Sequence, residues 1–427
     1  MVTAGLHHCT QVTMARARYG NVQRRLSGPL TVVIVAVGVL LLSKIGYIQN
    51  AEHWTADWRT ALFSTRNVSQ HDSVALVLIT DATLDGYPVR IPMDRHMLAK
   101  LVRTVASARP SAIGIDFVFV RPTDPAADAD LLSAIGETDI PIVLASVDER
   151  GRLTARQLEY HREFLATAKR PTGHVFFERK TNAFAISEHV IREMAEPAKS
   201  ADQQQSFAEV LAQIKRKGAK PHTPRIAWLL TPRDGSQTFY EVEASDLLGD
   251  PEDAAPLLPG LKDKIVLIGS DLVDLDRHLT PLSVVDEARM PGVKIHAHIL
   301  AQLIDDRWLR ALNWPEELLM LVAITLAGYT ASRRRKLGAF KRTLASVGSI
   351  SLVILGFVAF NTLNLVLPYT AALAAWLAAL SIGPRSDRIR RKFAAMFRFV
   401  SANGGLRWVT YYRLGSTLGW RLWRGRL

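Results

Sequence analysis

The stretch Val74-Ala-Leu-Val-Leu-Ile-Thr-Asp81 decides the fold, because a continuous apolar run here ends abruptly in a carboxylate. Three further apolar runs rich in β-branched residues follow at residues 113–120, 140–145 and 265–268. Short runs of this kind are typical of buried strands. The sequence therefore predicts that these segments are strands of the protein core.

Helical patterns lie between these runs. Met97-Leu98-Leu101-Val102-Val105 repeats at helical spacing, and Asp94 just before it is a suitable N-cap. Further helices are expected over residues 128–136 and 293–304. Strands alternating with helices predict an α/β fold with a largely parallel sheet flanked by helices. The region 150–225 is more polar, and we expect an insertion or an irregular lobe there.

Positive charge is concentrated beside the apolar segments of the chain. The net charge is +13, yet residues 1–28 carry +4, residues 332–343 carry +6 and residues 384–427 carry +10, so the rest is acidic. The positive-inside rule then predicts both termini in the cytoplasm and the large domain outside. A strongly basic soluble protein would suggest a nucleic-acid partner, but none is expected here because the basic residues flank apolar segments.

Four apolar segments are expected to cross the membrane, one before the large domain and three after it. They cover residues 29–48, 315–331, 344–360 and 365–383. A cleaved signal peptide is the alternative for the first, but Lys44 can extend it to a full span by reaching the far interface. No ionisable residue lies in the middle of a span, which argues against a transporter. The expected division is a basic arm 1–28, a large domain 50–312, a basic loop 332–343 and a tail 384–427.

Polar residues at the ends of the expected strands are candidates for a ligand site. Asp81 and Asp116 lie at or near the carboxyl ends of two of these strands, and ligands of open α/β sheets bind where the carboxyl ends of strands meet. Arg95 follows the expected N-cap and could bind an anionic group or pair with one of these aspartates. Asp276 and His296 complete the candidate ligand-binding set. A buried ion pair that merely fixes the loops is the alternative interpretation.

The residue pattern predicts neither a metal site nor a catalytic site. His296 and His298, with Asp276 and His278, invite a metal interpretation, but side chains two apart at a helix start point in different directions. No metal is therefore expected. The sequence shows no nucleophile elbow, no zinc-protease motif and no Walker motif, so neither a catalytic residue nor a cofactor is predicted. The only cysteine, Cys9, lies in the basic arm, and the large domain holds together without a disulfide.

Several blocks of the large domain resemble the CHASE2 domain, an extracytoplasmic sensor module of bacterial signalling proteins. They are residues 74–84, 92–96, 113–119, 124–128, 258–269 and 291–297, with Asp276 and Thr280-Pro281 between the last two. One departure is Arg90-Ile-Pro-Met, where the family commonly has tryptophans. The resemblance implies a sensor in the bacterial inner membrane, three spans after the domain, and a homodimer as the natural arrangement.

The resemblance also implies a cytoplasmic output domain, and only 44 residues follow Gly383. We therefore expect a non-enzymatic subunit that detects an unknown extracytoplasmic ligand and signals through a separate cytoplasmic partner. The alternatives are a non-signalling envelope scaffold and a truncated regulator of full-length CHASE2 proteins. The tail is basic and aromatic, and it is expected to bind membrane lipids or to dock the partner. Its candidate residues are Arg388, Arg391, Lys392, Arg407, Trp408, Trp420 and Trp423.

Overall fold

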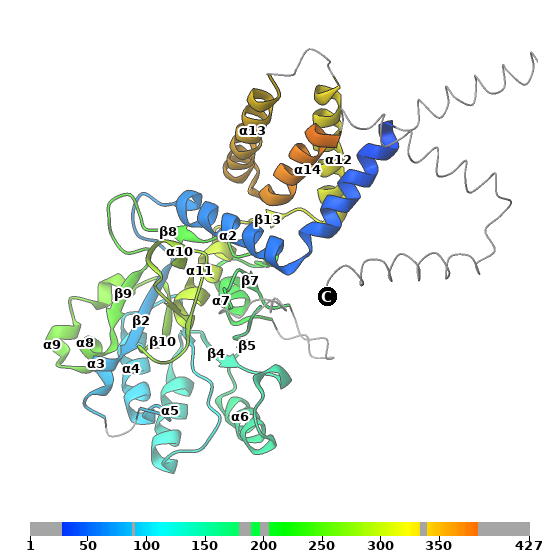
Figure 1. Cartoon of the computed structure of the whole chain (residues 1–427). Helices are drawn as coiled ribbons and strands as arrows, with labels where there is room; N and C mark the ends of the chain where they lie inside the picture. Colours follow the sequence, from blue (N-terminus) through cyan, green and yellow to red (C-terminus); the bar gives the residue numbers. More distant parts are fainter. Residues whose placement is uncertain (1–27, 88–89, 179–188, 197–204, 334–339, 383–427) are drawn as a thin grey trace, which may run out of the picture. The chain divides into compact units, whose positions relative to one another are not determined.

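The structure is a computed structural model that describes residues 28–87, 90–178, 189–196, 205–333 and 340–382. The described chain forms two compact units (Figure 1). The large unit consists of residues 46–312 and 354–368, and the helical unit contains the described parts of 1–45, 313–353 and 369–427. The N-terminal basic arm and all seven candidate residues of the tail lie outside the described residues.

A six-stranded parallel sheet forms the centre of the large unit, which confirms the predicted α/β fold (Figure 1). The longest strands, β2 and β10, pair along their whole length, with Val74 opposite Ile265 and Thr80 opposite Asp271. All strand pairs within this sheet are parallel. In spatial order the strands are β5 (Thr172–His174), β4 (Ile142–Ser146), β3 (Ala112–Ile115), β10 (Ile265–Asp271), β2 (Val74–Thr80) and β9 (Tyr240–Glu243).

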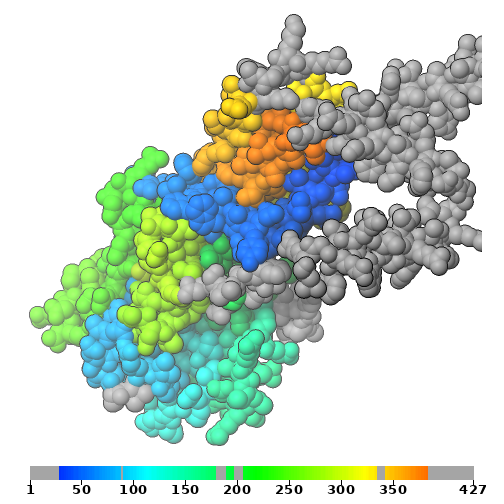
Figure 2. Space-filling model, viewed as in Figure 1, coloured from blue at the N-terminus to red at the C-terminus, as the bar shows by residue number. Residues whose placement is uncertain are grey.

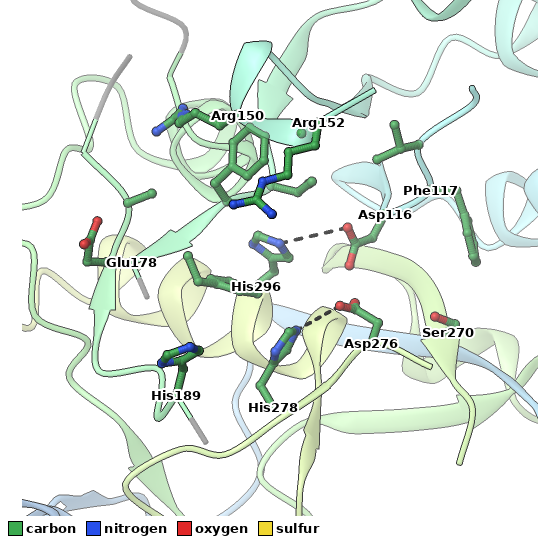
Figure 3. Close-up of a pocket in the computed structure, with 16 residues that line it drawn as sticks. Asp116, Phe117, Arg150, Arg152, Glu178, His189, Ser270, Asp276, His278 and His296 are labelled. Carbon is green, nitrogen blue, oxygen red and sulfur yellow. Dashed lines mark hydrogen bonds and ion pairs between the residues drawn. The ribbon is translucent and has the colours of Figure 1, made fainter. Parts of the chain in front are cut away.

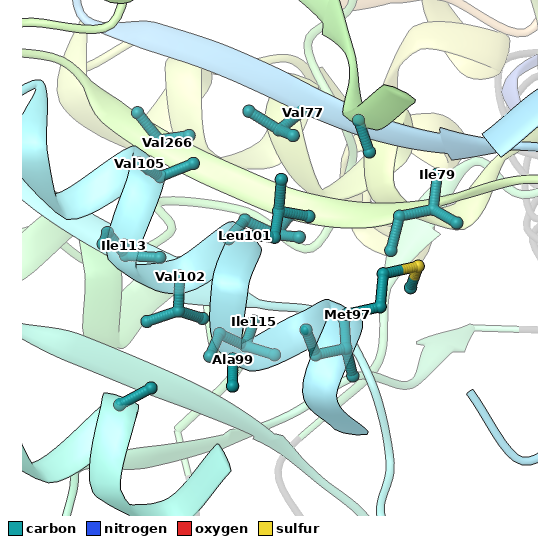
Figure 4. Close-up of a cluster of buried hydrophobic side chains, with 14 of the residues drawn as sticks. Val77, Ile79, Met97, Ala99, Leu101, Val102, Val105, Ile113, Ile115 and Val266 are labelled. Carbon is teal, nitrogen blue, oxygen red and sulfur yellow. The ribbon is translucent and has the colours of Figure 1, made fainter. Parts of the chain in front are cut away.

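Successive side chains of a strand point to opposite faces of the sheet, and helices cover both of these faces. On one face Val77 and Ile79 of β2 contact α4 (Arg95–Ser107), and α5 (Pro125–Glu137) packs beside it (Figure 4). On the other face Val74, Leu76 and Leu78 pack with α7 (Phe207–Lys215) and α11 (Gly292–Ile304). The apolar runs are continuous because each strand is buried on both sides.

The local signals place the helix starts well. Asp94 caps α4, because its carboxylate accepts a hydrogen bond from the Met97 amide at 2.8 Å. Asp124 caps α5 with Pro125 in the first turn, so this helix begins three residues before the predicted start. The helix α11 begins one residue before its predicted start and ends where expected.

The prediction of an irregular lobe at 150–225 is wrong for much of this region. The helix α6 (Ala155–Ala168), the edge strand β5 and the helix α7 all belong to the layered core. The composition of this region gives no clear sign of these elements, because α6 buries only His161, Phe164 and Ala168, and β5 has three residues.

The outer faces of α4, α5 and α6 are adjacent on the surface, in blue to green-cyan colours (Figure 2).

Short elements complete the large unit. The strand β3 ends at Ile115 rather than at residue 120, and the Asp116 amide still donates to the Ile268 carbonyl before the chain leaves the sheet. The others are α2 (Gly46–Phe63), α3 (Asp81–Leu84), α8 (Ala244–Leu248), α9 (Pro251–Ala254), α10 (Ser283–Asp286), η1 (Glu149–Gly151), η2 (Leu258–Gly260) and the pairs β1 (Thr65–Arg66) with β8 (Leu229–Leu230), β6 (Phe177–Glu178) with β7 (Glu193–Met194), β11 (Arg277–His278) with β12 (Met290–Pro291), and β13 (Arg310–Ala311) with β14 (Leu365–Val366).

The helical unit contains a helix over Gly28–Ser43, α12 (Trp314–Ser332), the first part of α13 (Phe340–Leu363) and α14 (Tyr369–Ile382). The helices α12 and α14 approach closely at Gly328, where an added Cβ would lie 2.8 Å from the Cβ of Ala379. The side chain of Lys44, expected to reach the membrane interface, pairs with Glu317 at 2.7 Å.

By length and composition, one described helix can cross a membrane, Arg342–Leu363. A second candidate results if Gly28–Ser43 and α2 are counted as one broken span. The first helix ends at Ser43, five residues before the predicted end of the span, and α2 begins at Gly46. The 14 residues of α14 extend about 21 Å, less than a hydrocarbon core of about 30 Å. The four-span topology therefore stays a prediction.

Candidate functional site

A cavity of about 880 Å³ opens at the carboxyl edge of the sheet, as expected for an α/β fold (Figure 3). Asp116 follows β3, and Ser270 lies at the end of β10, so the two neighbouring strands supply one wall. The hairpin of β6 and β7 and the loop after β4 supply the opposite wall through Phe177, Glu178 and Arg150. The structure thus brings three predicted residues, Asp116, Asp276 and His296, into one cavity.

Asp116 and His296 form the deepest polar pair of the cavity (Figure 3). The Nε2 atom of His296 lies 4.0 Å from Oδ1 of Asp116, and their side chains are 4% and 9% exposed. Residue 296 lies in the second turn of α11, and its ring packs 4.6 Å from Phe177 and 5.5 Å from Phe207, measured between ring centroids. The His296 Nδ1 atom is buried without a hydrogen-bond partner among the described residues. This ring therefore has hydrogen-bonding capacity to offer.

Burial makes the neutral forms of this pair favourable. Desolvation, and then the charge of Asp276, raise the pKa of Asp116 well above its ordinary value. Desolvation lowers the pKa of His296 to about 3, with the charge of Asp276 opposing it. At neutral pH His296 is therefore uncharged, and the raised pKa of Asp116 favours a carboxyl group that can donate a hydrogen bond.

Asp276 is placed by the start of α11. Its backbone is left-handed, with φ of 51°, and its carbonyl accepts from the Gly292 amide at 3.0 Å. An added Cβ at Gly292 would lie 2.2 Å from the Asp276 carboxylate, so a side chain at residue 292 would displace that carboxylate. The Asp276 carboxylate also accepts from His278 Nε2 at 2.9 Å (Figure 3). The negatively charged carboxylate of Asp276 thus lies beside the N-terminus of α11, which is the positive end of the helix dipole.

Two arginines line the cavity beside the aromatic side chains. The guanidinium of Arg150 stacks 4.5 Å above the Phe176 ring and is already paired with Asp148 at 2.7 Å. Arg152 points into the cavity above His296 (Figure 3). Arg152 is exposed, and no ion pair joins it to another residue of the described chain. Among the described residues that line the cavity, Arg152 is therefore the arginine that a ligand can pair with.

The other two predicted residues do not line this cavity. The carboxylate of Asp81 pairs with Arg90 and accepts from the Val273 amide at 3.1 Å, which ties the loop after β2 to the loop after β10. Arg95 is buried, bonds Asp128 at 3.2 Å and lies 4.5 Å from the Phe119 ring centroid. These contacts match the alternative in which ion pairs fix the loops.

The two histidines of α11 face different surroundings. His298 lies in the core, where Nδ1 accepts from the Leu229 amide at 3.3 Å and Trp228 packs against the ring. His296 faces the cavity instead, so the two rings do not converge on one point. No group of three or more histidine, cysteine, aspartate or glutamate side chains within the described chain is arranged to hold a metal.

Comparison with protein families decides the affiliation of this fold. A family model of the CHASE2 domain matches residues 31–330. The chain belongs to the CHASE2 family. CHASE2 domains are extracytoplasmic sensors, so the family implies a membrane localisation. Searches of curated proteins and of solved structures found no match.

Sequence reasoning missed several residues of the CHASE2 cavity. Arg150 lies in η1 after β4 and Arg152 directly follows η1, and Glu178 and His189 lie in the polar region that we expected to be an irregular lobe. Their only signal was position, because the loop after β4 must emerge at the same edge as Asp116. His278 was named only in the metal interpretation, and its contact with the Asp276 carboxylate required the fold.

Proposed function

We propose that this CHASE2 protein is a membrane-bound sensor subunit whose cavity at the carboxyl edge binds a small extracytoplasmic ligand. The observation that carries the proposal is the cavity itself, with its buried, incompletely bonded Asp116–His296 pair beneath Arg152. Small-molecule sites combine a cavity of this size with a few placed polar groups and aromatic side chains. The ligand that fits is a small polar molecule with one anionic group for Arg152 and an acceptor for the carboxyl of Asp116.

The wall of the cavity has a direct connection to the chain segment that follows the first apolar helix. Phe177 and Ala195, in β6 and next to β7, line the cavity. Arg192, one residue before β7, donates two hydrogen bonds to the Asp57 carboxylate of α2, at 2.8 and 2.6 Å. A ligand that moves this hairpin therefore acts on α2. Sensing requires that the ligand prefers one of the two hairpin positions, because equal affinity for both shifts nothing.

The output in this proposal is a separate cytoplasmic partner, contacted by the basic tail, and the protein itself is not an enzyme. The support is the family affiliation together with the basic clusters that flank the apolar segments. Both termini are then cytoplasmic and the large unit extracytoplasmic, in the inner membrane of a bacterium.

Ligand binding is tested by thermal unfolding of the full-length protein in lipid nanodiscs with small carboxylates and phosphate esters. A ligand at 100 times its Kd stabilises the protein by about 2.7 kcal/mol. We expect Arg152→Gln to abolish this stabilisation. The control Arg156→Gln changes an exposed arginine at the start of α6, outside the cavity, and should leave the stabilisation intact. Equal stabilisation of both variants would place the ligand elsewhere.

Topology and output need separate experiments. Cys9 is the only cysteine, so Cys9→Ser with Glu252→Cys places a single thiol on the exposed helix α9. A membrane-impermeant maleimide should label this thiol in spheroplasts, and labelling only after lysis would contradict an extracytoplasmic large unit. Crosslinking in native membranes then compares the intact protein with a version that ends at Gly383. A cytoplasmic regulator recovered only with the tail supports signalling, whereas exported partners recovered from both favour an envelope scaffold.

A further inference from the structure

The helix α2 is amphipathic in the reverse sense to a surface helix of a soluble domain. Three of its charged and polar residues, Asp57, Arg59 and Thr60, are buried, each 3% exposed or less. Its outer stripe consists of Tyr47, Ala51, Trp54, Trp58 and Leu62, which recur at i, i+4, i+7, i+11 and i+15. This spacing puts all five on one face of the helix, and none of them is charged.

The stripe is open to its surroundings over most of its length. Tyr47 is 74% exposed, Trp54 59% and Leu62 53%. Trp54 and Trp58 meet edge to face, with ring centroids 6.1 Å apart, so these two rings form one aromatic surface. Tryptophan and tyrosine are enriched where one end of the side chain is in an apolar phase and the other in water, as at a membrane interface.

The inward face of α2 holds the helix at a defined place in the large unit. Arg59 donates from Nη1 to the Leu367 carbonyl at 2.8 Å, and Ala56 packs in a small core with Phe360. Phe63 contacts Phe357 with a centroid distance of 4.7 Å. Phe357 and Phe360 belong to the last turns of α13, the described helix that is long and apolar enough to span a membrane. The helix α2 is therefore fixed beside the end of a candidate span.

We infer that α2 lies in the plane of the bilayer interface, with the stripe Tyr47, Ala51, Trp54, Trp58 and Leu62 inserted among the lipids. Two independent observations point to lipid. The stripe has the composition of an interfacial belt, and the contacts of Ala56 and Phe63 with the end of α13 fix the helix at the depth where a span leaves the hydrocarbon. None of the five stripe residues lines the ligand cavity. The lipid contact therefore holds whether or not a ligand binds.

The test uses single cysteines in the full-length Cys9→Ser protein, labelled with an environment-sensitive fluorophore and reconstituted in liposomes. Ala51→Cys and Leu62→Cys probe the stripe, and Glu252→Cys on α9 is the water-exposed reference. The stripe positions should show blue-shifted emission and loss of fluorescence when lipids with shallow nitroxide groups are included, while Glu252→Cys shows neither.

Two outcomes would overturn the inference. Emission at Ala51→Cys and Leu62→Cys equal to that at Glu252→Cys would show that the stripe faces water. A blue shift without quenching by nitroxide lipids would show that protein covers the stripe, either a second copy or another segment of this chain. Because none of the three substituted residues lines the cavity, the comparison does not depend on the proposed ligand.

Discussion

The ion pair between Arg192 and Asp57 should be among the largest single contributions of a charged group to the stability of the large unit. The Asp57 side chain is 4% exposed and Arg192 is 20% exposed, and two hydrogen bonds join them. Asp57 also offsets the mutual repulsion of neighbouring cations, because its charge acts on Arg225 together with those of Arg192 and Arg59. Asp57→Asn keeps the shape of the side chain and removes this compensation.

The expected cost follows from the burial of the pair. Breaking a buried ion pair costs about 3–5 kcal/mol, and the partial access of water to Arg192 reduces this to about 2–3 kcal/mol. For a domain of this size, a shift of about 2–4 °C per kcal/mol gives a decrease in Tm of about 4–12 °C. The assay is thermal unfolding of the full-length protein in nanodiscs, followed by circular dichroism.

The matched control is Asp306→Asn, which also removes a carboxylate that pairs with an arginine. Asp306 is 50% exposed and lies 2.7 Å from Arg216, so its loss should change Tm far less, because exposed pairs contribute little. The double variant Asp57→Asn with Arg192→Gln should recover part of the lost stability, since it removes the arginine that Asp57→Asn leaves without its carboxylate. Equal shifts for Asp57→Asn and Asp306→Asn would refute the reasoning.

Two further predictions concern packing and pH. Gly269→Ala should lower the free energy of unfolding by about 1–3 kcal/mol, because the added Cβ would lie 2.6 Å from the Val293 Cβ. The control Gly136→Ala should not destabilise the protein, because no atom lies within 4 Å of the added Cβ. Unfolding of both variants measures the difference. Burial lowers the pKa of His298 to about 3 in the folded protein, below its unfolded value of 6.5. The unfolded state then binds the proton first, so stability is complete above pH 6.5 and falls as the pH decreases towards 3. In His298→Gln this fall should be shallower, and an identical pH profile of Tm would contradict the assignment.

The strands and helix starts could be predicted because their signals are local. The run over β2 is apolar throughout since both of its faces are buried, and Asp94 caps the helix that it precedes by one residue. By contrast, β5 has three residues and no periodicity, and its place at the sheet edge comes from pairing with β4. Tertiary contacts rather than local preference determine such a strand.

In the candidate site, too, some residues could be placed from the sequence and others could not. Topology alone brings Asp116 to the carboxyl edge, and α11 brings His296 back over it, so their positions in sequence were informative. Arg95 looked equally suitable, but its partner Asp128 lies 33 residues away on α5, and no local pattern reveals which carboxylate it meets. The direction in which the α2 stripe faces is the hardest feature to predict from the sequence. The helical spacing is the same for a face turned into a core and a face turned outward.

The size of the α2 contacts constrains how a signal can leave the cavity. A change from 1:99 to 99:1 between two states requires about 5.5 kcal/mol of differential binding, about twice the contribution expected for the Arg192–Asp57 pair. That pair cannot carry a full switch alone. In the proposed sensor the hairpin would have to act on α2 through additional contacts, and the core of Ala56, Leu309, Phe360 and Val366 is one connection between α2 and α13. A ligand that only breaks the ion pair would therefore produce a partial response, and a complete response requires that this core repacks as well.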